Sequence, residues 1–440
     1  MGSAAHCLHT VACNAARHAA RPTTSGRNGV RSASSQGRSR PGDLLLGHRR
    51  PPLGHRILDR RPAGVGRGLD RHRRGQRRLR LGTEADLIHD LAGLRLVAQR
   101  LAGQRCDDPL SAVAHLGAVQ GQDLPGALTS VALRTSSRSH AEVVAAFDTG
   151  LLVRSWPMRG TLHLVPAVDL GWMLSLTRDR MIAGAATRRR EVGITDQTLV
   201  TGRELALSAL DGAGALPRKE LFESWRTAGL LVHSQTAVHL LGLLCQQSVL
   251  VLGPLAGREQ LVVSYADWIP QPRHLDRPEA LAELARRYLR SHGPATVADL
   301  ARWASLTLTE ARAAVAAVRD EFDHLRIDEV EHLHQPGLIE YWQDHRDDVA
   351  QLQLLPGFDE FILGYRDRSF AVADAHASRL VPGNNGMFRA SIVKDGQVIG
   401  VWRRGGTPKK PKLIAEGFQP LTDAELVAAQ AAFQALPPIS

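Results

Sequence analysis

The sequence lacks the patterns that mark several large functional classes. No apolar run approaches the ~18 residues of a transmembrane helix, and residues 1–17 have no sustained apolar region of the kind that signal peptides contain. Walker loops and the GxGxxG, GxSxG and HExxH motifs are also missing. These absences argue against nucleotide hydrolases and metalloproteases. The protein is expected to be cytoplasmic and to make no membrane contact.

Cysteine is scarce. The chain has four scattered cysteines, Cys7, Cys13, Cys106 and Cys245, with no CxxC and no paired His spacing of the kind that zinc sites show. This scatter argues against a zinc site and against a disulfide framework. The sequence therefore predicts reduced thiols, no metal and no cofactor.

Lysine is missing from residues 1–80, which contain 18 Arg and three acids. This segment therefore has a net charge of +15. Because the whole chain has a net charge of +11, the remaining residues have a net charge of −4. Residues 1–85 are rich in Arg, Gly, Ser and His and show no helical or strand periodicity, so a disordered tail is predicted. Three interpretations stay open: GC-rich DNA translated upstream of the true start codon, a solvated tail, or an arm that attracts nucleic acid.

A chain of 440 residues exceeds one hydrophobic core, so several domains are expected. Helical spacing followed by a β-favouring hairpin recurs three times after the tail, which is the order of a winged helix. The predicted fold class is mainly α with β wings. It has three tandem winged-helix modules, at residues 86–195, 196–275 and 276–348, and a small C-terminal β-barrel-like domain with a final helix at residues 349–440.

One hairpin and one helix start are predicted in detail. Residues 151–156 and 161–165 are β-favouring arms around a turn at Met158-Arg159-Gly160. In the third module, Thr309 is expected to begin the capping pattern of a helix that runs through residues 310–319.

Two neutral amides, Gln120 and Gln122, lie two residues apart between an apolar helical pattern and a Pro-Gly break. If this segment is extended or turning, both amides can project into one cleft. An amide pair cannot donate or take up a proton, but it can hold a water molecule and a nucleobase. The structural alternative is a pair of surface or helix-capping amides. Asp123 is either the N-cap of the next helix or a base.

Basic residues of the first hairpin are candidate DNA contacts. Arg154 lies in its first arm, Arg159 at its tip can meet a phosphate, and His163 shares a face with Thr161. The structural alternative is a wing with a buried Trp156 and a hydrogen-bonded His163.

Two further basic clusters follow. Arg366 and Arg368 alternate with acids, so they either contact DNA or form an ion network with those acids. Arg403, Arg404, Lys409 and Lys410 surround a Gly-Gly-Thr-Pro segment, which is either a phosphate-contacting surface or a solvated loop.

Three separated segments resemble the bacterial winged-helix DNA glycosylases, which act on alkylpurines and interstrand crosslinks. These segments are Leu116-Gly-Ala-Val-Gln-Gly-Gln122, Met158-Arg-Gly-Thr-Leu-His163 and Leu354-Leu-Pro-Gly-Phe-Asp359 with Gly364-Tyr-Arg-Asp-Arg368, and the resemblance spans roughly residues 90–435. It implies three winged helices and a β-barrel around a DNA-sized channel. The family's active-site motif is Gln, an aliphatic residue, then Gln or Asp. Gln120 and Gln122 match it, whereas Gly121 departs from it and predicts a looser backbone.

The resemblance implies a monofunctional glycosylase that hydrolyses the N-glycosidic bond of N7-alkylated purines or alkylation crosslinks. Such a base is cationic and leaves easily, so Gln120 and Gln122 would only position the water and stabilise the oxocarbenium sugar by their dipoles. Arg159 and His163 would support or bind the DNA backbone. The alternative class is a non-catalytic winged-helix regulator, which binds one sequence rather than a lesion. In both, a monomer with double-stranded DNA as its partner is expected.

Overall fold

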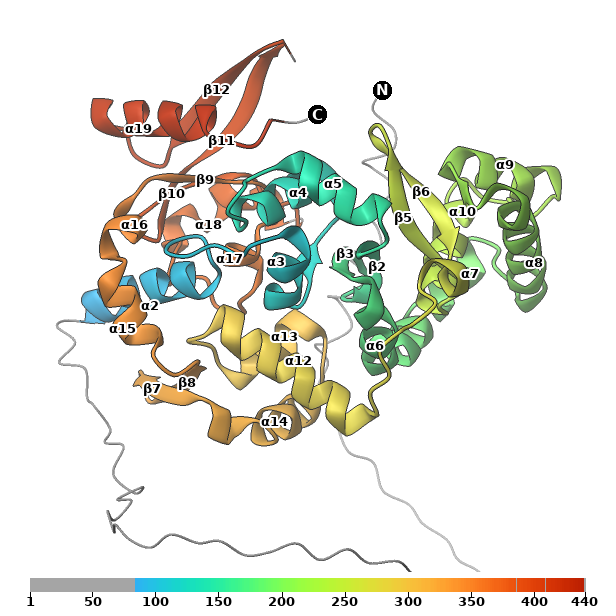
Figure 1. Cartoon of the computed structure of the whole chain (residues 1–440), viewed down its shortest axis with the longest axis horizontal. Coiled ribbons are helices and arrows are strands. Elements are labelled where there is room, and N and C mark those ends of the chain that lie inside the picture. Colours follow the sequence, from blue (N-terminus) through green and yellow to red (C-terminus); the bar gives the residue numbers. More distant parts are fainter. Residues whose placement is uncertain (1–83, 385, 408, 439–440) are drawn as a thin grey trace, which may run out of the picture. The chain divides into compact units, whose positions relative to one another are not determined.

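A computed structural model describes residues 84–384, 386–407 and 409–438 (Figure 1). All of them belong to one of the two compact units into which the chain divides. The tail predicted for residues 1–85 lies outside the described residues, apart from the start of α2 (Glu84–Ala98).

The described chain is a mixed α/β fold with antiparallel sheets, rather than the mainly α fold that was predicted. Its strands form a six-stranded, a four-stranded and a two-stranded sheet. No described helix is both long enough and apolar enough to cross a bilayer.

The first repeat begins after α2. Its elements are α3 (Pro109–Leu116), β1 (Val119–Gln120), α4 (Leu124–Leu133), α5 (His140–Asp148), β2 (Leu152–Met158) and β3 (Thr161–Pro166). The short strand β1 returns to pair with β3, the last strand of the hairpin, so that Gln120 lies opposite His163. The predicted turn is confirmed: Arg159 and Gly160 join β2 to β3, and both have positive φ, as in the tight turns that suit twisted hairpins.

The same order of elements occurs a second time. It comprises α8 (Asp196–Ala213), β4 (Ala215–Leu216), α9 (Arg218–Thr227), α10 (Thr236–Gln246), β5 (Leu250–Ala256) and β6 (Glu259–Ser264). Again the short strand, β4, pairs with the last one, β6. The two hairpins join edge to edge where Arg154 of β2 pairs with Leu252 of β5, which completes the six-stranded sheet. This junction was not predicted.

A third occurrence follows with α12 (Arg277–His292), α13 (Val297–Ala304), α14 (Leu308–Ala316), β7 (Asp323–Ile327) and β8 (Val330–His334). Here a single bridge between Ala295 and Leu333 takes the place of the short strand. The helix starts follow capping chemistry, because Thr296 and Asp299 form a reciprocal capping box at α13. The predicted cap Thr309 is wrong: Thr307 forms the capping box with Glu310, and α14 therefore starts two residues earlier.

Three helices fall between the repeats and were not predicted. They are α6 (Leu170–Gly184), α7 (Ala186–Glu191) and α11 (Tyr265–Trp268). α6 packs against β2 and α12, and buries Trp172, Met173 and Leu174 there.

The C-terminal part alternates short helices with strands. Its elements are α15 (Leu338–Asp344), α16 (Arg346–Ala350), β9 (Gln353–Leu355), α17 (Glu360–Leu363), α18 (Asp374–Leu380), β10 (Ser391–Lys394), β11 (Gln397–Thr407), β12 (Lys410–Gly417) and α19 (Asp423–Gln434). The four strands run in the order β12-β11-β10-β9, and the described residues contain no pairing between β12 and β9 that would close them. The expected barrel-like closure is therefore absent from this part of the chain.

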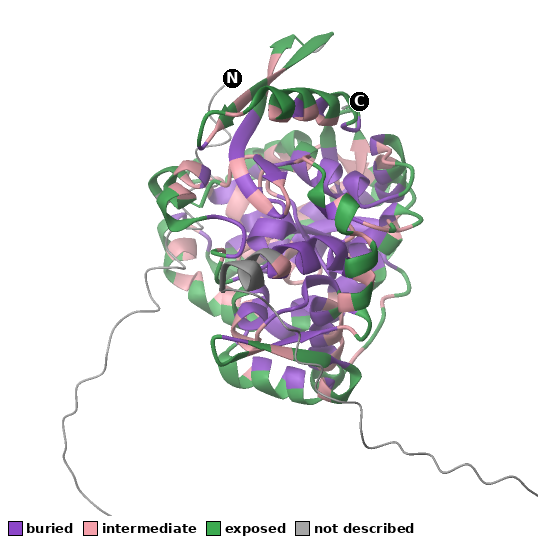
Figure 2. Cartoon of the chain, turned by 90° about the vertical axis from the view of Figure 1, so that its left-hand side faces the viewer, coloured by how far each residue is buried: buried purple, intermediate pink, exposed green. Residues whose placement is uncertain are grey.

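Buried apolar side chains form three clusters, and Figure 2 shows buried residues in the interior of the described chain. One cluster lies within the first repeat around Leu116 and Phe147, and a second lies within the second repeat around Trp225 and Leu240. The largest joins α2, α6 and the third repeat to the C-terminal strands. This shared core brings α13 and α17 close to β1.

Candidate active site

The two amides predicted to form the site bind each other. Gln120 lies at the end of β1 with only 4% of its surface exposed, and Gln122 is half-buried in the bend that follows. The backbone N–H of Gln122 donates to Gln120 Oε1 at 3.1 Å, and Gln120 Nε2 donates to Gln122 Oε1 at 2.8 Å.

These two bonds fix the orientation of both amides. A backbone N–H can only donate, so the Gln120 atom that it meets must be the oxygen. Gln120 therefore turns its nitrogen to Gln122, whose oxygen must accept it. Gln122 Nε2 makes no hydrogen bond within the described chain, and each amide oxygen keeps one free lone pair. The pair can thus offer both a donor and acceptors to a ligand.

Gly121 is held firmly, contrary to the looser backbone that was predicted. Its N–H donates to Leu162 O at 2.7 Å, and its carbonyl accepts from Arg154 Nε at 2.7 Å. A Cβ at this position would lie 2.6 Å from Leu164 Cδ1, so the Leu164 side chain occupies the space that a larger middle residue would need.

Arg154 is buried, with 5% of its surface exposed, and its guanidinium is occupied by protein groups. Besides Gly121, it donates to Gln260 Oε1 at 3.0 Å and reaches Gln122 O at 3.4 Å. Burial and the nearby charge of Arg218 lower the pKa of Arg154 to about 9, which leaves it charged at neutral pH. Its geometry suits positioning the Gln-Gly-Gln backbone.

Glu360, the first residue of α17, lies directly behind Gln120. Its Oε1 accepts the backbone N–H of Gln120 at 2.9 Å, and its Oε2 accepts the indole N–H of Trp303 at 2.9 Å. Nε2 of His292 lies 3.7 Å from the same carboxylate. Burial alone would raise the pKa of Glu360, but His292 and the charge of Arg159 outweigh burial and lower this pKa to about 2. The carboxylate is therefore ionised although it is completely buried.

His163 is completely buried and neutral. Arg159 Nη2 lies 2.8 Å from His163 Nε2, and because a guanidinium can only donate, Nε2 must accept. The ring proton is then on Nδ1, which donates to Thr161 O at 2.9 Å. Burial and the Arg159 charge lower the pKa of His163 to about 3. This agrees with the structural alternative for His163, and Trp156 likewise packs partly buried against the second apolar cluster.

Asp123 occupies the N-cap position of α4, as one of its two alternatives predicted, although its side chain makes no capping hydrogen bond. The acid at the end of the Leu354–Asp359 motif segment, Asp359, forms a fully buried ion pair with Arg134. The guanidinium donates to both carboxylate oxygens, at 2.8 and 2.9 Å, and Ser130 Oγ donates to the same group at 2.6 Å. This pair locks α17, and with it Glu360, to the end of α4.

The remaining basic residues divide by exposure. Arg366 and Arg368 form no ion pair with the alternating acids, because Asp359 binds Arg134 and Asp367 accepts from Ser369. Arg366 is exposed, and Arg368 is half-buried with Nε donating to Ile362 O at 2.9 Å. Arg403, Lys409 and Lys410 are exposed on the β11–β12 hairpin, and Arg404 lies over the ring of Phe433.

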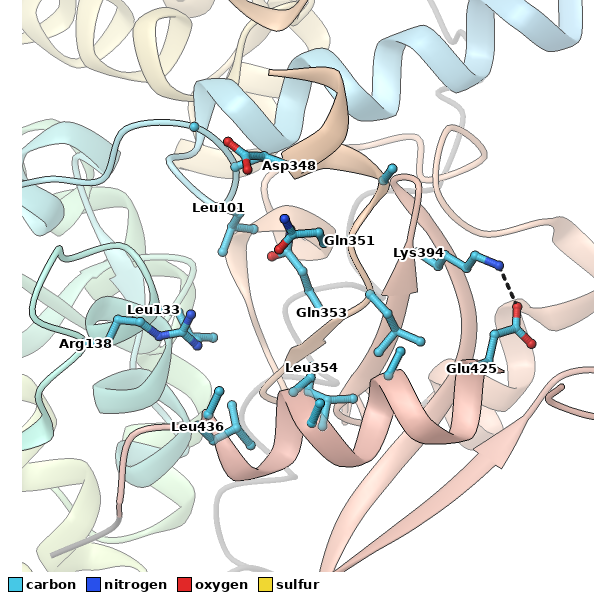
Figure 3. Close-up of a pocket in the computed structure, with 18 of the residues that line it drawn as sticks. Leu101, Leu133, Arg138, Asp348, Gln351, Gln353, Leu354, Lys394, Glu425 and Leu436 are labelled. Carbon is cyan, nitrogen blue, oxygen red and sulfur yellow. Dashed lines mark hydrogen bonds and ion pairs between the residues drawn. The ribbon is translucent and has the colours of Figure 1, made fainter. Parts of the chain in front are cut away.

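A cavity of about 660 Å³ lies between α19, β9 and the segment after α2 (Figure 3). Leu101, Leu133, Leu354 and Leu436 give it an apolar lining, Arg138 reaches it from one side, and Lys394 and Glu425 form an ion pair at the other. Neither Gln120 nor Gln122 lines it, so it is separate from the amide pair. No group of three or more His, Cys, Asp or Glu in the part of the chain described here could hold a metal ion.

Sequence reasoning did not single out Glu360, Trp303 or Arg134 as parts of the site. Glu360 directly follows the Leu354–Asp359 motif segment, but 240 residues separate it from Gln120, so no local pattern connects the two. Trp303 follows helical spacing typical of core residues, and Arg134 follows the apolar stretch of α4 without a neighbouring acid. An acid directly after a recognisable motif segment was the one usable sequence signal.

Comparisons with known proteins give the family and the fold that this chain resembles. A family model described as DNA glycosylase AlkZ-like matches residues 113–437. The chain is similar to the interstrand DNA cross-link repair glycosylase of Streptomyces sahachiroi, with 29% identity over 308 residues that cover 66% of this chain and 80% of the relative. The solved structure of Streptomyces sahachiroi DNA glycosylase AlkZ has a similar fold, with a TM-score of 0.65 and 24% identity over 78% of this chain and 94% of that one.

Proposed function

Because the chain belongs to the AlkZ-like DNA glycosylase family, we propose that it hydrolyses the N-glycosidic bond of N7-alkylated purines, including those in alkylation crosslinks, in double-stranded DNA. The curated relative is named for interstrand cross-link repair, which favours the same class of lesion here. Gln120 and Gln122 are the proposed catalytic residues.

The observation that carries this proposal is the fixed orientation of the two amides. Their mutual hydrogen bonds, together with Arg154 on the Gly121 carbonyl and Glu360 on the Gln120 N–H, hold the pair before DNA arrives. Preorganised dipoles of this kind stabilise a developing charge without having to reorient during the reaction.

The chemistry follows from the atoms left free. A water that donates to a free lone pair of Gln120 or Gln122 Oε1 keeps its own lone pair for attack on the sugar carbon. The bond from this carbon to the purine nitrogen breaks, its electron pair neutralises the cationic base, and the proton that the water loses passes to solvent because neither amide can accept it. An N7-alkylated purine is cationic and needs no protonation to leave, so the lack of a proton donor in the amide pair is no obstacle. The carbonyl dipoles face the positive charge that develops on the sugar, and Gln122 Nε2 can donate to a sugar or base oxygen.

The three repeats supply a scaffold for binding DNA. Each repeat begins with a helix and a short extended segment, and continues with two helices and a hairpin. The short segment pairs with the last strand of that hairpin. This order supports three winged-helix modules with the predicted boundaries. The exposed Arg366, Arg403, Lys409 and Lys410, together with Arg404, are the proposed backbone contacts, whereas Arg154 and His163 are proposed to position the site from within.

The test is base release from a duplex that contains N7-methylguanine. The protein is incubated with this duplex, and abasic sites are measured as alkali-labile breaks under single-turnover conditions. Gln122→Ala should lower the rate about 100-fold, the typical effect of removing one preorganised dipole.

Gln351→Ala is the matched control, because Gln351 is an exposed glutamine that lines the separate cavity. It should leave the rate unchanged. If the unaltered protein releases no base from methylated or crosslinked duplex, but binds one DNA sequence tightly, the regulator alternative replaces the glycosylase.

A further inference from the structure

Arg302 is an exposed arginine on α13 that the sequence did not mark as part of the site. Its neighbour Trp303 donates to Glu360 Oε2 at 2.9 Å, so this turn of α13 lies against the carboxylate that holds Gln120. Asp299 lies three residues before Arg302, on the same face of the helix, and its Oδ1 accepts the backbone N–H of Arg366 at 2.8 Å. That bond brings the segment with Arg368 to Arg302.

Arg159 reaches the same place from the first hairpin. It donates to His163, which lies opposite Gln120 in the β1–β3 pairing, and Gln120 in turn binds Glu360. Three arginines from distant parts of the chain, Arg159, Arg302 and Arg368, therefore stand on segments that are bonded to the neighbourhood of the Gln120–Glu360 contact.

None of the three has a carboxylate partner within salt-bridge distance in the described chain. The Arg159 guanidinium is bonded to a neutral histidine, Arg368 donates to a backbone carbonyl and lies over the Phe388 ring at 5.0 Å, and Arg302 makes no side-chain hydrogen bond there. Burial, followed by the charges of Arg302 and Arg159, lowers the pKa of Arg368 to about 10. Burial also lowers the pKa of Arg159; the charge of Glu360 opposes this effect and the charge of Arg302 adds to it.

Like charges that are partly desolvated and unpaired cost free energy, and an anion between them removes this cost. Guanidinium groups match the oxygens of a phosphate, which they bind with two parallel hydrogen bonds. We propose that Arg159, Arg302 and Arg368 form one phosphate-binding site, which takes the phosphodiester next to the nucleotide held at Gln120 and Gln122. The choice of nucleotide rests on the proposed function, whereas binding of DNA phosphate by the three arginines does not.

The test measures affinity for an undamaged duplex as a function of salt concentration, by fluorescence anisotropy. Loss of one phosphate contact should reduce the slope of log K against log salt by about 0.9, and affinity in about 0.1 M salt by about 5–10-fold. Arg302→Gln should show this change, and Arg302→Lys should keep most of the slope because it keeps the charge. Adding Arg368→Gln to Arg302→Gln should roughly double the reduction.

Arg319→Gln is the matched control. It removes the same charge from a partly exposed arginine, but Arg319 already binds both carboxylate oxygens of Glu331, at 2.9 and 2.7 Å. The proposal fails if Arg302→Gln keeps the original slope, or if Arg319→Gln lowers it equally. A lower slope for Arg302→Gln in a protein that never releases N7-methylguanine would retain the phosphate site and overturn the glycosylase.

Discussion

The backbone N–H of Gln120 donates to Glu360 Oε1 at 2.9 Å, although the two residues are 240 positions apart in the chain. The contact places an ionised carboxylate directly behind the first amide of the proposed catalytic pair. It also ties the first repeat to the C-terminal part, since Glu360 begins α17 and Gln120 ends β1.

Glu360 should make stability depend on acid pH. Its pKa in the folded protein is about 2, below the ordinary value of 4.5, so the unfolded chain binds this proton more readily. The stabilisation is therefore fully present above about pH 4.5 and is lost as pH falls towards 2. Urea unfolding at several pH values should show that the free energy of unfolding declines with acid. This decline should be smaller in Glu360→Gln than in the unaltered protein, by about 1–3 kcal/mol.

Glu204→Gln, at an exposed acid of α8, is the comparison variant and should follow the unaltered protein. An identical acid decline in Glu360→Gln and the unaltered protein would show that Glu360 does not contribute this stability.

Arg154 should affect catalysis rather than affinity. Arg154→Gln removes the bond to the Gly121 carbonyl, so the amide pair loses its support, and small displacements of catalytic groups can cost about 100-fold in rate. We expect base release under saturating protein to slow about 10–100-fold, while undamaged duplex binds within about twofold of the original affinity, because Arg154 is buried.

Arg403→Gln should give the opposite pattern, because Arg403 is exposed on β11. The affinity of this variant for undamaged duplex should fall, while its rate of base release under saturating protein stays the same. Equal losses of affinity in both variants would rule out this division of roles. Melting temperatures, measured in parallel, identify any loss that comes from unfolding.

Gly121 and Leu164 should be energetically coupled. A Cβ at position 121 would lie 2.6 Å from Leu164 Cδ1, so Gly121→Ala overpacks the site and should cost about 1–3 kcal/mol. Leu164→Ala alone creates a cavity and should cost about 2–5 kcal/mol. In the double variant the new methyl enters the vacated space, so its total cost should be lower than the sum by about 0.5–2 kcal/mol. If urea unfolding shows that the two losses of unfolding free energy simply add in the double variant, the new methyl group does not fill the space left by the Leu164 side chain.

Local chemistry made several elements predictable. The Arg159-Gly160 turn follows from a glycine between two β-favouring arms, and α19 starts at its capping threonine, Thr422. At α14 the same rule favours Thr307 over the predicted Thr309. Glu310 stands three residues after Thr307, as a capping box requires, whereas Arg312 stands three residues after Thr309.

Contacts between distant segments could not be predicted. The β2–β5 junction depends on two edge strands that meet through one residue pair, Arg154 and Leu252, and no local pattern encodes it. For the amide site, the sequence indicated Gln120 and Gln122 but not their partners. Glu360 was not singled out, and Arg154 was predicted to contact DNA rather than the Gly121 carbonyl. Both of these residues are charged and buried, which sequence periodicity does not reveal.

The junction between the two hairpins has a mechanical consequence. Only one residue pair of the strand ladder crosses it. The Arg154 side chain donates both to Gln260 on the second hairpin and to the Gly121 carbonyl, which follows β1 in the first repeat. Any hinge-like displacement of the second hairpin would therefore pull on the loop of the amide pair through one guanidinium. Strain imposed on the second half of this sheet would therefore reach the amide pair without a separate relay.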